Sequence, residues 1–324
     1  MKAVLVDGDA LVWGDADIGA PGPGEVLIAN RASAVNRADL AQRAGGYPPP
    51  PGASEILGLE CAGVVESVGE GVTRVEAGDR VCALLAGGGY AEQVVAPAGQ
   101  VLKIPGQLSF TEAAALPEVF ATAYLNLFVE GTLQFGETAL LHAGASGVGT
   151  AGIQLCREFG SPCFVTAGSD HKIARCVELG AAGGANRHTE RFVDKVPEWT
   201  EGDGLDVILD PVGAAYLKDN LRALKADGRL VIIGLLGGAD LAVERGLGLM
   251  MMKRLRIVGS TLRARSIARK AAVMDALKER VWPAIAEGRI RPVIEAVVPM
   301  PDADSAHRVI AGNETFGKVV LEAP

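Results

Sequence analysis

A chain of 324 residues is too long for one ordinary hydrophobic core and predicts two domains, each of roughly 100–200 residues. The formal net charge of −8 argues against a nucleic-acid-binding surface, because that function needs clustered positive charge. Five cysteines without a Cys-x-x-Cys pair argue against a disulfide framework. The apolar runs are well short of the ~20 residues that span a bilayer, which argues against a membrane anchor. We therefore expect a cytoplasmic protein.

Residues 1–118 contain short valine-rich runs that alternate with polar residues and are separated by glycine and proline. This pattern predicts the short strands of a β-rich, barrel-like domain. The segment YPPPPG, which begins at Tyr47, cannot be a central strand or a helix interior, because its four prolines lack a backbone donor. We therefore predict a loop that carries Tyr47.

The pattern changes after Pro117. From there, continuous apolar runs alternate with helix-length amphipathic segments, and such runs are typical of strands buried on both faces of a sheet. This alternation predicts an α/β fold with a doubly wound parallel sheet, at residues 119–262.

The last part of the chain differs again. We expect one helix at 266–288, followed by two short strands at 293–300 and 317–323 that resemble the first domain more than the second. The interpretation is a discontinuous β-rich domain, formed by 1–118 with 263–324, interrupted by the parallel-sheet domain.

A glycine-rich turn, HAGASGVGTAG, follows the first apolar strand of the parallel-sheet region. Gly144, Ser146 and Gly147 stand where this strand enters a helix, and such a turn brings backbone N–H groups to a pyrophosphate. A plain strand–helix turn is the alternative, but the surrounding βαβ unit favours a dinucleotide site. Ser146 replaces the middle glycine and is small enough for the turn.

The end of the second strand indicates which dinucleotide is bound. An NAD site would place an acidic residue there, whereas this chain has Gly168 and Ser169, which leave room for a 2′-phosphate, and Lys172, which can supply its charge. Asp170 lies one residue further on and is interpreted as a cap of the next helix. An ordinary exposed lysine remains the alternative for Lys172, and NADPH is favoured over NADH.

Further segments lie along the whole chain: SAVNRADL, GLECAGVVESVGEGV, GDRVCALL, GGYAEQVV, AALPEVFATAY, HAGASGVGTAGIQL and LDPVG. On these segments the sequence resembles a known family over essentially its whole length: the zinc-independent quinone oxidoreductases of the medium-chain dehydrogenase/reductase superfamily. The resemblance is closest to the branch of the tumour-suppressor-inducible quinone oxidoreductase. It implies a Rossmann domain, a GroES-like domain and a homodimer. The segments that carry the likeness to the inducible branch are GGYPPPPGASEILGLE, STLRARS and GNETFGKVVLE.

The resemblance also predicts that no metal is bound. Where zinc-dependent relatives have a cysteine ligand this chain has Asn36, and where they have a histidine it has Leu59, and zinc prefers neither. Without a Lewis acid, reduction of a simple ketone is disfavoured, whereas a quinone is electrophilic enough to be reduced once it is positioned against a nicotinamide.

By the same resemblance, Asn36 and Tyr47 are expected near the nicotinamide and are the candidate catalytic residues. The family usually has a tyrosine where this chain has Arg187, which could stack on the adenine or pair with the phosphate. A packing role for Tyr47 and a backbone-bonding role for Asn36 are the alternatives. The full set of expected cofactor residues is Asn36, Tyr47, Thr122, Gly144, Ser146, Gly147, Val148, Ser169, Lys172, Arg187, Leu262, Arg263 and Lys318.

The sequence therefore predicts NADPH-dependent reduction of a small quinone, with no nucleic-acid or membrane partner. Reduction of an enone or enoyl thioester is the alternative within the same class. A nucleotide-binding protein with little turnover is the alternative outside it.

Overall fold

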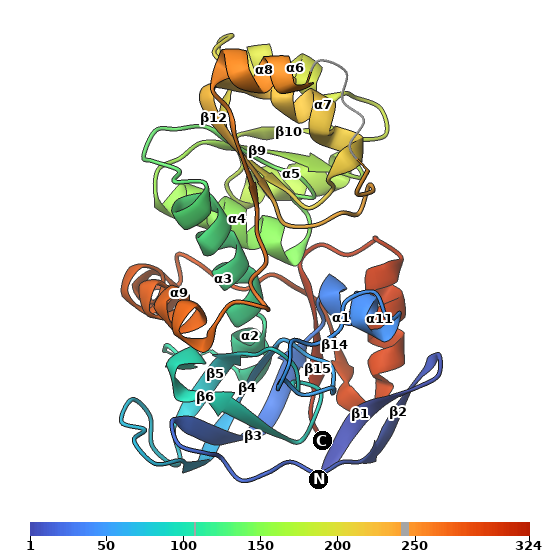
Figure 1. The fold of residues 1–324 in the computed structure, drawn as a ribbon, viewed down its shortest axis with the longest axis vertical. Helices are drawn as coiled ribbons and strands as arrows, with labels where there is room; N and C mark the ends of the chain where they lie inside the picture. The colour runs from blue at the N-terminus through green and yellow to red at the C-terminus, as the bar shows by residue number, and fades with distance from the viewer. Residues whose placement is uncertain (107, 241–245) are drawn as a thin grey trace. The chain divides into compact units, whose positions relative to one another are not determined.

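The computed structural model describes residues 1–106, 108–240 and 246–324. The chain forms two compact units (Figure 1). The discontinuous unit comprises Met1–Ala121 and Leu262–Pro324, and the parallel-sheet unit comprises Thr122–Thr261. No helix of the described residues has both the length and the apolar character needed to cross a membrane.

The parallel-sheet unit contains a six-stranded sheet in the order β10-β9-β8-β11-β12-β13, with every pair parallel. Helices alternate with these strands along the chain, because continuous apolar strands need cover on both faces. The strands are β8 (Ala139–Leu141), β9 (Cys163–Ala167), β10 (Gly183–Asn186), β11 (Leu205–Asp210), β12 (Leu224–Ile232) and β13 (Arg256–Gly259). The predicted doubly wound sheet is confirmed.

The helices of this unit alternate with its strands, and two of them begin at a serine N-cap. They are α4 (Gly147–Glu158), α5 (Asp170–Leu179), α6 (Phe192–Trp199), α7 (Ala214–Ala223) and α8 (Gly246–Lys253). Upstream, α3 (Pro117–Tyr124) continues into a π-helical segment, η2 (Leu125–Glu130). Their apolar faces pack on the sheet around Leu140, Ile208 and Leu230, each of which is fully buried.

The discontinuous unit is built on a mainly antiparallel sheet in the order β14-β15-β3-β4-β5-β7, with β6 also paired to β3. A separate hairpin joins β1 to β2. The strands are β1 (Lys2–Asp7), β2 (Ala10–Asp15), β3 (Glu25–Ala34), β4 (Glu60–Val68), β5 (Arg80–Leu84), β6 (Gln93–Pro97), β7 (Val101–Lys103), β14 (Ile294–Pro299) and β15 (Lys318–Glu322). The helices are α1 (Arg37–Arg43), α2 (Phe110–Ala114), α9 (Ile267–Arg280), α10 (Trp282–Ala286) and α11 (Ala303–Ala311), with 3-10 turns η1 (Ala98–Gln100) and η3 (Met300–Asp302).

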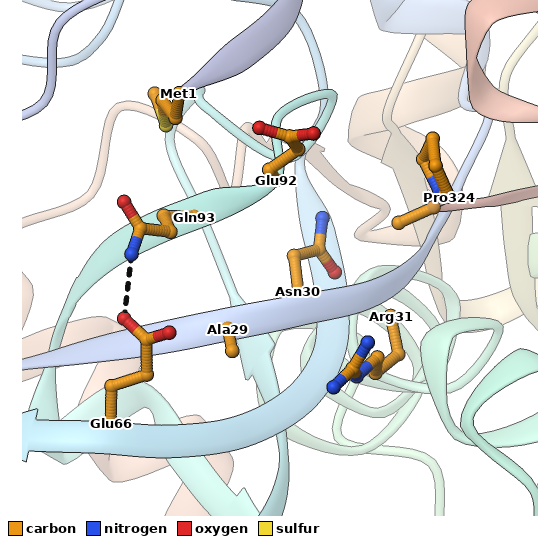
Figure 2. Close-up of a pocket in the computed structure, with 9 residues that line it drawn as sticks. Met1, Ala29, Asn30, Arg31, Glu66, Glu92, Gln93 and Pro324 are labelled. Atoms are coloured by element: carbon orange, nitrogen blue, oxygen red, sulfur yellow. Dashed lines mark hydrogen bonds between the residues drawn. The ribbon is translucent and has the colours of Figure 1, made fainter.

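One edge of β3 changes its partner midway. Residues 25–29 pair with β6, whereas residues 32–34 pair with β15. A hollow of about 410 Å³ lies at this change, and Figure 2 shows the side chains around it. The amide of Asn30 donates to the carbonyls of Gly89 and Ala91. Gln93 donates to Glu66 at one side of the hollow, as the dashed line in Figure 2 shows. None of the predicted site residues lines this hollow.

The single helix expected at 266–288 is wrong. The structure has two helices there, α9 and α10, and the break lies at Val281. Pro283 is the physical reason, because proline has no N–H to donate to the turn before it and its ring opposes that turn. It therefore stands near the start of α10, where its missing donor costs nothing.

Candidate functional site

The glycine-rich turn lies at the carboxyl end of β8, where α4 begins. Ser146 is the N-cap of α4, and its Oγ accepts a hydrogen bond from the Gly149 N–H at 3.1 Å. Among the described residues, no protein group accepts from the N–H groups of Gly147 and Val148, the first two of the helix. Both residues are partly exposed, and the N-terminus of a helix favours a nearby negative charge.

Close packing explains the small residues of this turn. A Cβ at Gly144 would lie 2.5 Å from Cβ of Val165 on β9, and a Cβ at Gly149 would lie 2.5 Å from the Ala143 carbonyl oxygen. Ala143 itself has a φ of 55°, a left-handed conformation that a non-glycine residue adopts only at an energetic cost. The turn is therefore tightly constrained, and Ser146 serves it as a cap.

The order of the strands puts this turn at the switch point of the sheet. The sheet runs from β8 toward β9 and β10 on one side, and toward β11, β12 and β13 on the other. In doubly wound folds the crevice outside the carboxyl ends of the strands at this reversal is where nucleotides bind.

A second cluster of predicted residues lies at the carboxyl ends of β9 and β10. Ser169 is the N-cap of α5, since its Oγ accepts from the Lys172 backbone N–H at 3.3 Å, and the expectation that Asp170 caps this helix is wrong. Asp170 is the first residue of the helix, and its carboxylate accepts from the Asn186 amide at 2.9 Å. One oxygen of the Asp170 carboxylate is thus hydrogen-bonded to a side chain of the neighbouring strand.

Arg187 approaches the same place from the adjacent strand. Asn186 pairs with Ala167 in the parallel register of β10 and β9, which places the next residues of the two strands side by side. A Cβ at Gly168 would lie 3.5 Å from Arg187 Nη2. The guanidinium of Arg187 therefore covers the glycine next to Ser169, on an exposed edge of the sheet.

In the discontinuous unit, Asn36 belongs to a buried polar network. Its Nδ2 donates to Glu60 Oε1 at 2.9 Å and to the Ala34 carbonyl at 3.1 Å, and its Oδ1 accepts from Lys318 Nζ at 2.7 Å. Lys318 also donates to the Val35 carbonyl and lies 2.8 Å from Glu60 Oε1. Both amide protons of Asn36 are thus used, and its orientation is fixed.

Lys318, expected to contact the cofactor, is 3% exposed. An ammonium group has three protons, and the three protein oxygens around Nζ can take all of them. In the structure Lys318 is therefore a buried hydrogen-bond partner of the Asn36 side chain. Sequence reasoning missed this pairing, because the two residues are 282 positions apart.

Asp39 holds Asn36 from the other side. Its carboxylate accepts from the Asn36 backbone N–H at 2.7 Å, from the Gly58 N–H at 3.1 Å and from the Tyr90 hydroxyl at 3.0 Å. Burial raises the pKa of Asp39 to about 6, against these hydrogen bonds, which lower it. The spacing Asn36-x-x-Asp39 was a signal in the sequence, since an acid three residues after an N-cap often bonds back to it.

Glu118 completes the network. Its backbone N–H donates to Glu60 Oε2 at 2.8 Å. Burial, and then the negative charge of Glu60, raise the pKa of the Glu118 carboxyl to about 8. Glu118 was not among the predicted site residues, because nothing in its local sequence indicates that it lies beside a second carboxylate.

The remaining predicted residues fall into the two units. Tyr47, Leu262 and Arg263 lie in the discontinuous unit, where Tyr47 is partly buried and the other two are buried. Thr122 lies in α3, and its carbonyl accepts from the Asn126 amide at 2.8 Å. His142 is a core residue, with its Nδ1 within hydrogen-bonding distance of Thr166 and its Nε2 within hydrogen-bonding distance of Asn220.

Comparison with known proteins gives matches over both units. Residues 22–106 match the alcohol dehydrogenase GroES-like domain, and residues 147–279 match the zinc-binding dehydrogenase family. The human synaptic vesicle membrane protein VAT-1 homolog is 33% identical over 93% of this chain and 80% of its own length. The quinone oxidoreductase of Rattus norvegicus is 30% identical over 95% of this chain and 92% of its own. The predicted GroES-like and Rossmann-like fold is thereby confirmed.

Solved structures also resemble the whole chain, and one of them contains a cofactor. Mycobacterial Rv1454c complexed with NADPH superposes with a TM-score of 0.87, at 28% identity, over 99% of this chain and 100% of the other.

The description of the matched family mentions zinc, and the residues at the expected zinc-ligand positions are Asn36, Leu59 and Glu60. The Asn36 amide donates both its protons, Leu59 is apolar and 1% exposed, and Glu60 is already paired with an ammonium group. The described residues also contain no group of three His, Cys, Asp or Glu side chains that could hold a metal. These side chains do not fit a catalytic zinc ion.

Proposed function

Because this chain is an oxidoreductase of the medium-chain dehydrogenase/reductase superfamily, we propose that it reduces quinones with NADPH and without a metal ion. The proposal has three parts: the cofactor, the absence of a Lewis acid and the class of substrate. Each part depends on different residues.

The choice of NADPH is supported by one observation, the Arg187 guanidinium beside Gly168 at the ends of β9 and β10, next to the Ser169 cap. Lys172 and Arg187 are proposed to bind the 2′-phosphate, together with the hydroxyl of Ser169. A guanidinium and an ammonium supply the charge that a phosphate needs, and Asp170, the nearby acid, is engaged by Asn186. The NADPH complex of a similar protein supports the same choice.

The pyrophosphate is proposed to lie at the start of α4. The N–H groups of Gly147 and Val148 point to the helix N-terminus without a protein acceptor among the described residues, while Ser146 already caps the turn. Gly144 keeps the turn close to β9. Thr122 and Leu262 remain proposed cofactor contacts on the resemblance alone.

When bound, the nicotinamide ring supplies a hydride. The residues proposed to serve it are Asn36 and Tyr47. The amide oxygen of Asn36 has a second lone pair beside the one that accepts from Lys318, so it can also accept from a bound molecule. The Tyr47 hydroxyl has no hydrogen-bond partner within the described part of the chain, so it can donate to a substrate carbonyl.

A quinone suits such a site. Without a metal to polarise a carbonyl, the protein can contribute positioning, hydrogen bonds and exclusion of water, and a substrate that is already electrophilic needs no more. An activated alkene has the same character, so enone and enoyl-thioester reduction is the competing possibility.

The test is to offer a panel of substrates to the protein with excess NADPH and a metal chelator present throughout. The rate of each reaction is measured as the loss of absorbance of the reduced cofactor. The panel holds an ortho-quinone, a para-quinone, an enone, an enoyl thioester and a simple ketone. We expect the two quinones to be reduced fastest and the simple ketone not at all. If the enone or the thioester is reduced faster than the quinones, the protein is an alkene reductase instead. Tight NADPH binding with no turnover would favour a nucleotide-binding protein.

A further inference from the structure

Arg263 lies between β13 and α9, and its side chain joins three distant segments of the discontinuous unit. Its Nε donates to the Ala86 carbonyl at 2.8 Å, its Nη1 to the Tyr47 carbonyl at 3.2 Å and its Nη2 to Gln42 Oε1 at 2.7 Å. The residue is 3% exposed. A buried guanidinium with this many acceptors around it is held rigidly, because its donors form a planar fork.

The same guanidinium also lies against the Tyr47 ring, with its central carbon 5.3 Å from the ring centroid. A cation at that distance is attracted to the face of an aromatic ring. Both the backbone and the ring of Tyr47 are therefore held by one side chain. The hydroxyl is the part of Tyr47 that Arg263 leaves available.

The loop around Tyr47 needs such an anchor on one side only. Pro48 restricts the backbone of the residue before it to extended conformations, so the chain after Tyr47 is stiff. Before Tyr47 stand Gly45, with a φ of 75°, and Gly46, and glycines restrict the backbone least. Arg263 removes the freedom that these two glycines would otherwise give to Tyr47.

The backbone of Arg263 is itself held by a hydrogen bond from a second buried cation, Lys270. Lys270 on α9 is 4% exposed, and its Nζ donates to the Arg263 carbonyl at 3.2 Å. The electrostatics agree with the geometry: burial and then Glu118 raise the pKa of Tyr47, and the positive charge of Arg263 lowers it. The cation thus acts on the phenol as well as on its backbone.

We propose that Arg263 is a positioning residue that fixes the Tyr47 hydroxyl for the substrate, and that its guanidinium is not a ligand of the dinucleotide. The proposal depends on the proposed function for the role of Tyr47. It reassigns a residue that the family resemblance would place against the cofactor.

The experiment compares Arg263→Met, Tyr47→Phe and the double variant, with Arg269→Met, a change at an exposed arginine of α9, as the matched control. Arg263→Met should lower kcat/KM for a para-quinone by about 100-fold, the scale of a displacement of about 1 Å at a catalytic group. In the Tyr47→Phe background the same change should cost no more than about twofold, because the hydroxyl that Arg263 orients is already gone. Arg269→Met should leave kcat/KM unchanged. Losses that multiply in the double variant would overturn the proposal.

The dissociation constant for NADPH, measured by fluorescence titration, separates positioning from cofactor binding. It should change by no more than about twofold in Arg263→Met, since a lost charge-assisted contact would weaken binding by about tenfold or more. A loss of NADPH affinity as large as the loss of kcat/KM would assign Arg263 to the cofactor and end the proposal.

Hydrogen exchange provides a readout that does not depend on turnover. Arg263→Met should speed amide exchange in residues 42–57, and unchanged exchange there would contradict the proposal even if the wild-type protein reduced no quinone. Gln42→Leu removes one of the three acceptors of Arg263, together with the hydrogen bond from Gln42 Nε2 to the Glu55 carbonyl, and should shift exchange and kcat/KM in the same direction by a smaller factor. It keeps the test available if Arg263→Met does not fold.

Discussion

The ammonium group of Lys318 lies 2.8 Å from Glu60 Oε1, and both side chains are almost completely buried, at 4% and 0% exposed. Both contact the amide of the partly buried Asn36, which donates to Glu60 and accepts from Lys318. A buried ion pair of this kind fixes a geometry more surely than it adds stability, because both charges lose their hydration.

Removal of one member of this pair should therefore be costly. Lys318→Met leaves the Glu60 carboxylate buried without its counter-charge, and the free energy of unfolding should fall by ~3–5 kcal/mol. The double variant Lys318→Met with Glu60→Gln should recover part of the loss. Urea denaturation measures both, and a loss below ~1 kcal/mol in the single variant would show that water compensates the charge.

Asp39 should make stability depend on pH. Its pKa is raised from 3.8 to about 6 in the folded protein, mainly by burial, so the folded state holds this proton more tightly than the unfolded state does. The stabilising contribution is present below pH ~4 and is lost as the pH rises to about 6.

Asp39→Asn cannot titrate and is the control for this effect. The free energy of unfolding of the wild type, minus that of Asp39→Asn, should decrease between pH ~4 and ~6 and stay level above that range. An increase over the same interval would mean that the hydrogen bonds from Asn36, Gly58 and Tyr90 outweigh burial.

Gly149 should not tolerate a side chain. A Cβ there would lie 2.5 Å from the backbone oxygen of Ala143, which cannot move without opening the turn. Gly149→Ala should destabilise the protein by ~1–3 kcal/mol and weaken NADPH binding. Gly152→Ala on the same helix is the matched control, since its Cβ would meet only the ends of the Leu141 and Leu127 side chains, at 3.2 and 3.4 Å. Equal effects of the two changes would refute this role of the turn.

Lys172 and Arg187 should set the preference for NADPH. Lys172→Ala and Arg187→Ala should each raise KM for NADPH on the order of tenfold and leave KM for NADH nearly unchanged, because NADH lacks the 2′-phosphate. Steady-state kinetics with one quinone and both cofactors measures this. Equal effects on both cofactors from Arg187→Ala would favour stacking on the adenine.

The parallel sheet could be predicted because its signals are local. Each of β8, β9 and β11 is a continuous buried run, and the turn at Ser146 combines a cap with small residues. The helix break at Val281 also has a local signal, Pro283, which lies within a long amphipathic pattern that favours one continuous helix.

The partners of the site residues could not be predicted, because they come from distant parts of the chain. Asn36 could be selected from its position, but Glu60 and Lys318 reach it from 24 and 282 residues away. Arg263 contacts the Tyr47 carbonyl across 216 residues. Only the fold brings these side chains together, and no pattern in one sequence specifies such pairs.

The most direct test of the central claim is the ratio of kcat/KM for NADPH to kcat/KM for NADH, with a para-quinone as acceptor and a chelator present. We predict a ratio on the order of 100 in favour of NADPH, equivalent to two charge-assisted contacts with the 2′-phosphate, and no loss of rate on chelation. A ratio near one, or activity that returns only when zinc is added, would contradict the account.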